Sequence, residues 1–169
     1  MGLQLTRGSE YAIRAMMYLA ARPAGEVSSL RDVGREQNIP ESFLAKIFQN
    51  LVHSGLVVGR PGPGGGFALA RPCSAITVAQ VVQAIDGPFS LNRCVLWPQT
   101  CERSERCTMH KVWVRAQEHL MDVLEKVSFA DLVLAQAAGG DDALSHLLDP
   151  SAQAPAPVRR RLPAASRGR

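Results

Sequence analysis

The stretch IPESFLAKIFQNLVHSGLVVGRPGPGGGFALARP, residues 39–72, decides the fold of this chain. Apolar residues recur at helical spacing in its first half, which predicts an amphipathic helix over residues 41–54 that ends at Gly55. Two short apolar runs, 56–58 and 67–70, then flank a Gly/Pro-rich turn and predict a β-hairpin. The helix face expected to be buried carries Phe43, Leu44, Ile47, Phe48, Leu51 and Val52.

Two helices are predicted before this stretch. The apolar run over residues 11–21 is rich in helix formers. Ser28 or Ser29 then caps a short helix, with Asp32 in its first turn, before a break at residues 38–40. A helix, a short helix, an amphipathic helix and a hairpin follow one another in the order of a winged helix-turn-helix.

The chain beyond the hairpin is predicted to be helical around one long loop. Thr77 opens a helix with a capping box, and Gly87 closes it. A loop over residues 89–107 precedes a long helix from about residue 108 to residue 127, and Ser128 caps a final short helix. The long helix carries one apolar stripe, made of Met109, Val112, Trp113, Ala116, Leu120, Val123, Leu124 and Val127.

Charge is unevenly distributed along the chain, whose formal net charge is +4. Residues 1–72 hold eight basic and five acidic side chains, whereas residues 73–150 hold six and ten. The basic first part can therefore face a polyanion, and the acidic middle part cannot. No stretch reaches the roughly 18 apolar residues of a membrane span. No signal-peptide pattern opens the sequence, so we expect a cytoplasmic protein with no membrane partner.

The polar face of the helix over residues 41–54 has the composition of a recognition helix. Such a helix offers small and polar side chains to base edges while its other face is buried. An ordinary amphipathic surface helix has the same pattern, but here a hairpin follows after a single glycine, and the combination favours a DNA reader. Arg60 in the hairpin suits a narrow minor groove or a phosphate. The expected DNA-binding residues are Ser42, Phe43, Ala45, Lys46, Gln49, Arg60 and Gly64.

Three of the four cysteines, Cys94, Cys101 and Cys107, fall within fourteen positions of the predicted loop. Their wide spacing does not suit a structural zinc finger, which usually opens with two cysteines two to four residues apart. It suits thiolates that converge from irregular backbone on an iron–sulfur cluster. Two candidates for a fourth ligand are His110, one helical turn after Cys107, and Glu10 in the first helix. Redox-sensing thiols without a metal are the alternative at this point.

Five segments of the chain resemble the IscR/NsrR-type iron–sulfur transcription regulators, and together they span about residues 2–135. LTRGSEYAIRAM resembles the first helix of that family, IPESFLAKIFQNLVHSGLV its recognition helix and GPGGGFALARP its wing. TVAQVVQAIDGP resembles the helix before the sensor loop, and CTMHKVW resembles the end of that loop with the start of the dimerisation helix.

The resemblance implies a homodimer with two winged helices, a long crossing helix from each subunit and a cluster held near that interface. By position, it implies that Cys94, Cys101 and Cys107 are the cysteine ligands. His110 matches the histidine of the IscR branch, and Glu10 matches the acidic fourth ligand of other branches. The histidine favours a [2Fe–2S] over a [4Fe–4S] cluster, and the presence of both candidates leaves the cluster type open.

Two positions depart from the family pattern. The first intercysteine gap has six residues, where IscR-like members have five. The arginine that usually precedes the GPGGG string is Pro61 here, with Arg60 one place earlier. We therefore assign the main sequence-reading contact to the helix over residues 41–54.

The sequence thus predicts a mainly α-helical fold with a small β-hairpin wing, a winged helix-turn-helix joined to a long dimerisation helix. The expected parts are a DNA-binding domain over residues 1–72, a sensor loop with dimerisation helices over 73–138, and an extension over 139–169 that is disordered from about residue 150. The expected function is a homodimeric regulator that binds double-stranded operator DNA and senses redox, nitric oxide or iron–sulfur status through a bound cluster. A cluster-free regulator that uses thiol switching or a small-molecule ligand is the alternative. The protein has no bond-making role in either case, so we expect it not to be an enzyme.

Overall fold

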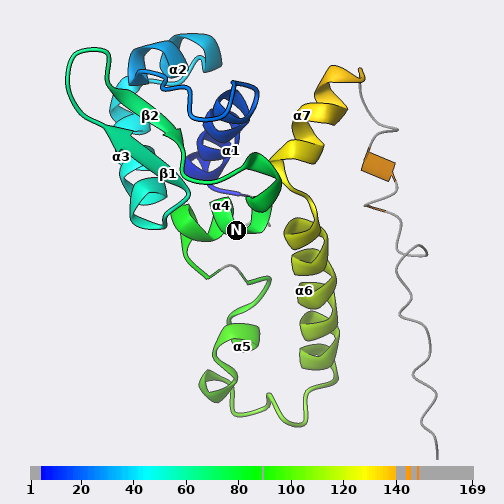
Figure 1. Cartoon of the computed structure of the whole chain (residues 1–169). Coiled ribbons are helices and arrows are strands. Elements are labelled where there is room, and N and C mark those ends of the chain that lie inside the picture. Colours follow the sequence, from blue (N-terminus) through cyan, green and yellow to red (C-terminus); the bar gives the residue numbers. More distant parts are fainter. Residues whose placement is uncertain (1–4, 89, 140–143, 146–147, 149–169) are drawn as a thin grey trace, which may run out of the picture.

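The computed structural model describes residues 5–88, 90–139, 144, 145 and 148. It confirms the predicted fold class, because the described part is mainly helical and carries a two-stranded antiparallel hairpin (Figure 1). None of the described helices is long and apolar enough to cross a membrane. The tail predicted to be disordered lies outside the described residues.

The elements are α1 (Arg7–Ala20), α2 (Leu30–Gln37), α3 (Glu41–His53), β1 (Val57–Arg60), β2 (Gly66–Leu69), the 3₁₀ turn η1 (Cys73–Ala75), α4 (Val78–Asp86), α5 (Arg93–Leu96), the 3₁₀ turn η2 (Pro98–Thr100), α6 (Thr108–Lys126) and α7 (Phe129–Ala137).

Side-chain caps start three helices at the predicted places. The Ser29 hydroxyl accepts the backbone N–H of Asp32 at 3.1 Å, so Ser29 rather than Ser28 caps α2. Capping boxes open α4 at Thr77 and α7 at Ser128. Each cap satisfies an N–H group that the first helical turn leaves without a partner.

The first helix begins earlier than its apolar pattern indicates. The prediction starts it at residue 11, whereas α1 starts at Arg7. Thr6 caps it by accepting the backbone N–H of Ser9 at 3.2 Å. The added turn buries a polar side chain, Ser9, and hydrophobic periodicity cannot reveal such a turn.

A tight turn sets α2 against α3. Asn38 adopts the left-handed conformation with φ 51° and ψ 53°, which asparagine tolerates better than most residues. Ile39 then points into the core and donates its backbone N–H to the Gly34 carbonyl at 2.9 Å. A Cβ atom on Gly34 would lie 2.9 Å from the Ile39 carbonyl oxygen, so glycine permits this approach. The two helices are therefore joined as in a helix-turn-helix.

One apolar core is shared by α1, α2, α3 and the hairpin. The prediction for α3 is wrong for Phe43 and Val52, which are 55% and 40% exposed. Both residues flank the buried stripe, and a helical period alone does not show how wide that stripe is. The α3 residues that are buried as predicted are Leu44, Ile47, Phe48 and Leu51.

The same core continues past the hairpin. Ile76, Val81 of α4 and Phe129 of α7 are buried in it together with residues of α1 and α3. The core therefore crosses the predicted domain boundary after residue 72, and that boundary itself stays a prediction.

The rest of the chain forms an arm that projects from this packed body (Figure 1). We call residues 5–86 with residues 127–137 the head, and residues 90–126 the arm. The prediction of an unbroken loop before α6 is wrong, because α5 and η2 lie within it. A helix of four residues is too short to show a helical period of apolar residues in the sequence. The long helix α6 lies close to its predicted bounds, yet none of its residues is buried.

Candidate DNA-binding surface and cysteine-rich loop

The outer face of α3 presents the polar residues that the sequence assigned to DNA. Ser42, Lys46 and Gln49 are exposed, and Ala45 is half-buried between them. Phe43 is also exposed and lies edge-on to the Tyr11 ring of α1, with 6.0 Å between ring centroids. The face therefore combines small, polar and cationic groups with one aromatic ring, which suits contact with base edges and thymine methyl groups.

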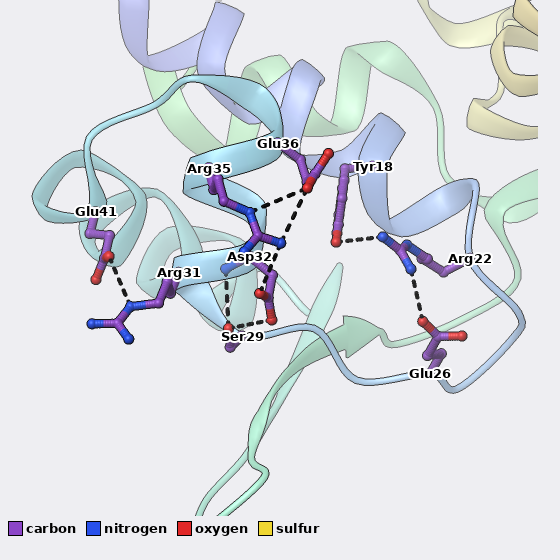
Figure 2. A network of polar contacts seen from close by, with 9 residues as sticks. All are labelled: Tyr18, Arg22, Glu26, Ser29, Arg31, Asp32, Arg35, Glu36 and Glu41. Atoms are coloured by element: carbon purple, nitrogen blue, oxygen red, sulfur yellow. Dashed lines mark hydrogen bonds and ion pairs between the residues drawn. The ribbon is translucent and has the colours of Figure 1, made fainter.

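The cations beside this face divide into two kinds. On α2, Arg31 lies 3.9 Å from Glu41, and Arg35 lies 3.6 Å from Asp32 and 3.3 Å from Glu36, as Figure 2 shows. These exposed pairs contribute little to stability, but they place a carboxylate beside each of the two arginines.

Two other cations keep their charge uncompensated. Within the described residues, Lys46 on α3 and Arg60 on β1 make no ion pair or hydrogen bond. Cations without an ion-pair partner among the described residues thus lie on the recognition helix and the wing, and Arg14 of α1, beside the Tyr11 ring, is a third. A phosphate backbone would meet positive charge there.

The wing is fixed to the recognition helix by aromatic packing. The rings of Phe48 on α3 and Phe67 on β2 lie 4.5 Å apart between centroids, and Phe48 is fully buried. Phe67 also pairs with Ser28 through two backbone hydrogen bonds of 2.9 Å, which attach the hairpin to the segment before α2. The wing is thus attached both to α3 and to the segment before α2.

The tip of the wing is shorter than the sequence suggested. β1 and β2 pair from Val57 opposite Leu69 to Arg60 opposite Gly66, so the turn spans only residues 61–65. Arg60 therefore lies at the end of a strand, directly below the turn. Gly64 lies within the turn, is exposed and has φ +76°, a conformation that favours glycine.

The three loop cysteines come from three different local structures. Cys94 lies in α5, Cys101 follows η2, and Cys107 directly precedes α6 without a side-chain capping bond, and all three are free and half-buried. The loop is built mainly from successive short turns, and its backbone is tied to α6 where the Leu91 N–H donates to the Gln117 side chain at 2.9 Å. Within the described residues, no three His, Cys, Asp or Glu side chains are close enough together to hold a metal ion. The structure therefore does not bring the predicted ligands together.

The two candidates for a fourth ligand differ in their surroundings. Glu10 lies in the first turn of α1 and is exposed to solvent. His110 lies in the first turn of α6, and its Nδ1 atom is buried without a hydrogen-bond partner. A buried ring nitrogen without a partner costs free energy unless a ligand or another group satisfies it. The donor set of three thiols and this imidazole thus fits a cluster chemically.

One polar contact near these residues could not be found by sequence reasoning. The Asp86 carboxylate at the end of α4 accepts hydrogen bonds from Thr6 at 2.6 Å and from Ser9 at 2.8 Å. Thr6 and Ser9 are about 80 positions away along the chain, and no spacing rule links them to Asp86. The short helix that carries Cys94 was missed for the different reason given above.

Comparison with known families decides the identity of the chain. The model of the Rrf2 family, described as an iron-dependent transcriptional regulator, matches residues 5–135. The chain belongs to the Rrf2 family. A relative from Yersinia enterocolitica, named the HTH-type transcriptional regulator IscR, is 33% identical over 131 residues, which is 78% of this chain and 79% of the relative. The protein is thus an IscR-like transcriptional regulator of the Rrf2 family.

Solved structures of Rrf2-type regulators share the fold. The global cysteine regulator CymR of B. subtilis superposes with a TM-score of 0.66 at 24% identity, over 79% of this chain and 98% of that one. The IscR of T. potens superposes with a TM-score of 0.65 at 24% identity, over 84% and 95%. These neighbours support the arrangement of helices and wing described above.

Proposed function

We propose that this Rrf2 protein binds operator DNA as a homodimer and that its DNA binding responds to an iron–sulfur cluster held by the cysteine-rich loop. The observation that carries the DNA part is the exposed face of α3, where Lys46 has no ion-pair partner within the described residues while the α2 arginines each lie beside a carboxylate. Each α3 enters a major groove, and the wing carries Arg60 toward the adjacent backbone or minor groove.

The dimer is supported by the exposed apolar side chains of α6. Met109 and Val112 are 49% and 54% exposed, and no residue of this 19-residue helix is buried. Such a long helix with an uncovered apolar stripe gains stability when a second copy covers it. Two copies related by a two-fold axis then present two recognition helices to two half-sites.

The cluster is supported by the donor set rather than by a preformed cage. Cys94, Cys101 and Cys107 supply thiolates, and the buried Nδ1 of His110 is a nitrogen in need of a partner. Of the two candidates, His110 is favoured over the exposed Glu10, and a histidine ligand favours [2Fe–2S]. When bound, the cluster supplies a centre that oxidation, nitrosylation or cluster loss can alter. The protein's own contribution is to hold the loop in one conformation while the ligands are joined.

Anaerobic purification of the full chain tests this proposal. The protein should be coloured and contain iron and labile sulfide, and Cys101→Ala should abolish the visible absorption. Cys73→Ala is the matched control, because Cys73 is also free and half-buried but lies in η1 of the head. A colourless wild-type protein without iron would overturn the cluster part.

The same experiment addresses the thiol-switch alternative. Four free, half-buried cysteines are also compatible with a sensor that forms sulfenic acids or disulfides. A colourless protein whose DNA affinity changes on oxidation and recovers with a reductant would favour this second function. The DNA part is tested by gel shift, where affinity for a palindromic duplex must fall steeply as salt is raised.

A further inference from the structure

The last turn of α4 lies between the recognition helix and the cysteine-rich loop. Asp86 ends α4, and Gly87 and Pro88 lead toward the arm, whose described residues begin at Ser90. The two carboxylate oxygens of Asp86 each accept one hydroxyl, from Thr6 at 2.6 Å and from Ser9 at 2.8 Å. Hydrogen bonds to a carboxylate are stronger than those between neutral groups, so this contact fastens α4 to the start of α1.

The same turn of α4 also reaches α3. A Cβ atom on Gly8 would lie 3.0 Å from Ile85, so the ends of α4 and α1 are in close contact there. Gly8 and Ile85 line a pocket of about 480 Å³ together with Phe43, Lys46 and Asn50 of α3. Displacement of this turn therefore changes the shape of a pocket whose other wall is formed by α3 residues at the candidate DNA surface.

The opposite end of α4, its first turn, is held by backbone hydrogen bonds to the end of α6 and to α7. The Val78 N–H donates to the Val127 carbonyl at 3.1 Å, and the Phe129 N–H donates to the Ile76 carbonyl at 2.9 Å. Val78 and Val127 also share a small buried cluster with Val82. These bonds join the end of α6 to the start of α4, so the arm begins and ends on the same helix.

The two ends of α4 are held by different kinds of contact. At the α6 end, backbone hydrogen bonds are backed by a buried apolar cluster. At the other end, the exposed Asp86 holds two hydroxyl groups, and Ile85 packs beside Gly8 and against the main core. A change in the shape of the cysteine-rich loop reaches the aspartate end first, because the arm follows Asp86 within a few residues of the chain.

From this arrangement we propose that Asp86 is a positioning residue that couples the cysteine-rich loop to the recognition helix through Thr6 and Ser9. The purpose of the coupling rests on the proposed function, but its existence can be tested without a cluster. Coupling between two sites is reciprocal, so DNA bound at α3 must alter the loop to the extent that the loop alters DNA binding.

The test measures amide hydrogen exchange in the cluster-free full chain, with and without a DNA duplex that this chain has selected from a random-sequence pool. In the wild type, DNA should slow exchange of amides in residues 90–107 at least about threefold, which corresponds to about 0.6 kcal/mol of coupling. Asp86→Asn removes the charge and leaves one acceptor oxygen, so it should abolish most of this slowing while exchange in α3 is still slowed by the DNA.

A second variant and a control keep the result interpretable. Ser9→Ala removes one hydroxyl from the other side of the contact and should reduce the slowing in the same way. The double variant should lose little more than either single one, because both act on one contact. Glu26→Gln, which alters a carboxylate paired with Arg22 far from α4 in the chain, should behave like the wild type.

Two outcomes overturn the proposal. One is a wild-type loop whose exchange does not respond to DNA, and the other is a folded Ser9→Ala or Asp86→Asn protein whose loop responds as strongly as the wild type. Failure of the proposed cluster is read separately, from the iron content and absorption spectrum of the anaerobically purified wild type. The coupling measurement uses cluster-free protein and is independent of that result.

Discussion

The head and the arm of this regulator differ in how far their side chains are buried. The head buries large apolar side chains from α1, α3, α4 and α7 in one core, and its hairpin is packed against α3. The arm contains α5, η2 and α6, and none of these elements has a buried residue. The head thus carries its stability within one chain, whereas the arm has an exposed apolar stripe that the proposed second copy would cover.

The largest expected difference between the two regions is in the cost of removing an apolar side chain. Phe48→Ala in the head should lower the free energy of unfolding by about 3–5 kcal/mol, because it leaves a cavity in a closed core. Val112→Ala in the arm should cost less than about 1 kcal/mol for the dilute monomer, because Val112 is already half exposed. Urea unfolding at low protein concentration measures both. Equal costs would contradict the division into head and arm.

The next effect concerns the proposed dimer contact through the apolar stripe of α6. Val112→Lys should raise the dimer dissociation constant at least about 100-fold, about 2.7 kcal/mol, because two desolvated lysines would meet the apolar stripe across the two-fold axis. Sedimentation over a range of concentrations measures this constant. Glu118→Lys, which places the same side chain elsewhere on α6, is the matched control and should leave the dimer largely intact. An unchanged constant for Val112→Lys would show that the stripe is not the interface.

A smaller effect is expected where the wing joins the head. A Cβ atom on Gly66 would collide with the carbonyl oxygen of Ser28, so Gly66→Ala should cost about 1–3 kcal/mol of stability and loosen the wing. Gly59→Ala on the paired strand is the control, since its Cβ would meet only the Phe67 ring, at 3.5 Å. Thermal unfolding compares them, and an equal loss in both variants would rule out the Ser28 contact as the cause.

The smallest expected effect separates the free cation from the paired ones. Lys46→Ala should weaken binding of the selected DNA about tenfold, about 1.4 kcal/mol, and lower the salt slope by about one. Arg31→Ala should have less effect, because Arg31 already lies beside the Glu41 carboxylate, which a phosphate would have to displace. Gel-shift titration at several salt concentrations measures both. A larger loss for Arg31→Ala would show that α2 rather than α3 makes the main charged contact.

The sequence predicted the head better than the arm for a physical reason. Caps such as Ser29, Thr77 and Ser128 act within one helical turn, so their residues stand close together in the sequence. The apolar period likewise located the buried side of α3, and it failed only for Phe43 and Val52 at the edges of that side.

The arm and the Asp86 contact depend on interactions that no local pattern encodes. Cys94 lies on a short helix, and the loop that carries it is tied to α6 by the Leu91–Gln117 hydrogen bond between residues far apart in the sequence. The hydrogen bonds of Asp86 connect it to residues 80 and 77 positions earlier in the sequence. No local sequence pattern around Asp86 predicts them. The sequence could therefore propose candidate ligands by residue type, whereas it could not give their arrangement, and their role as ligands stays a prediction.

The contact between Phe48 and Phe67 has a consequence for how an operator is lost. The two rings hold the wing against α3 with 4.5 Å between their centroids. We therefore expect the proposed major-groove contacts of α3 and the backbone contacts of the wing to form and break together. In the proposed homodimer, a signal would then change the distance or angle between whole half-sites, so operators that differ in half-site spacing should respond differently to the same signal.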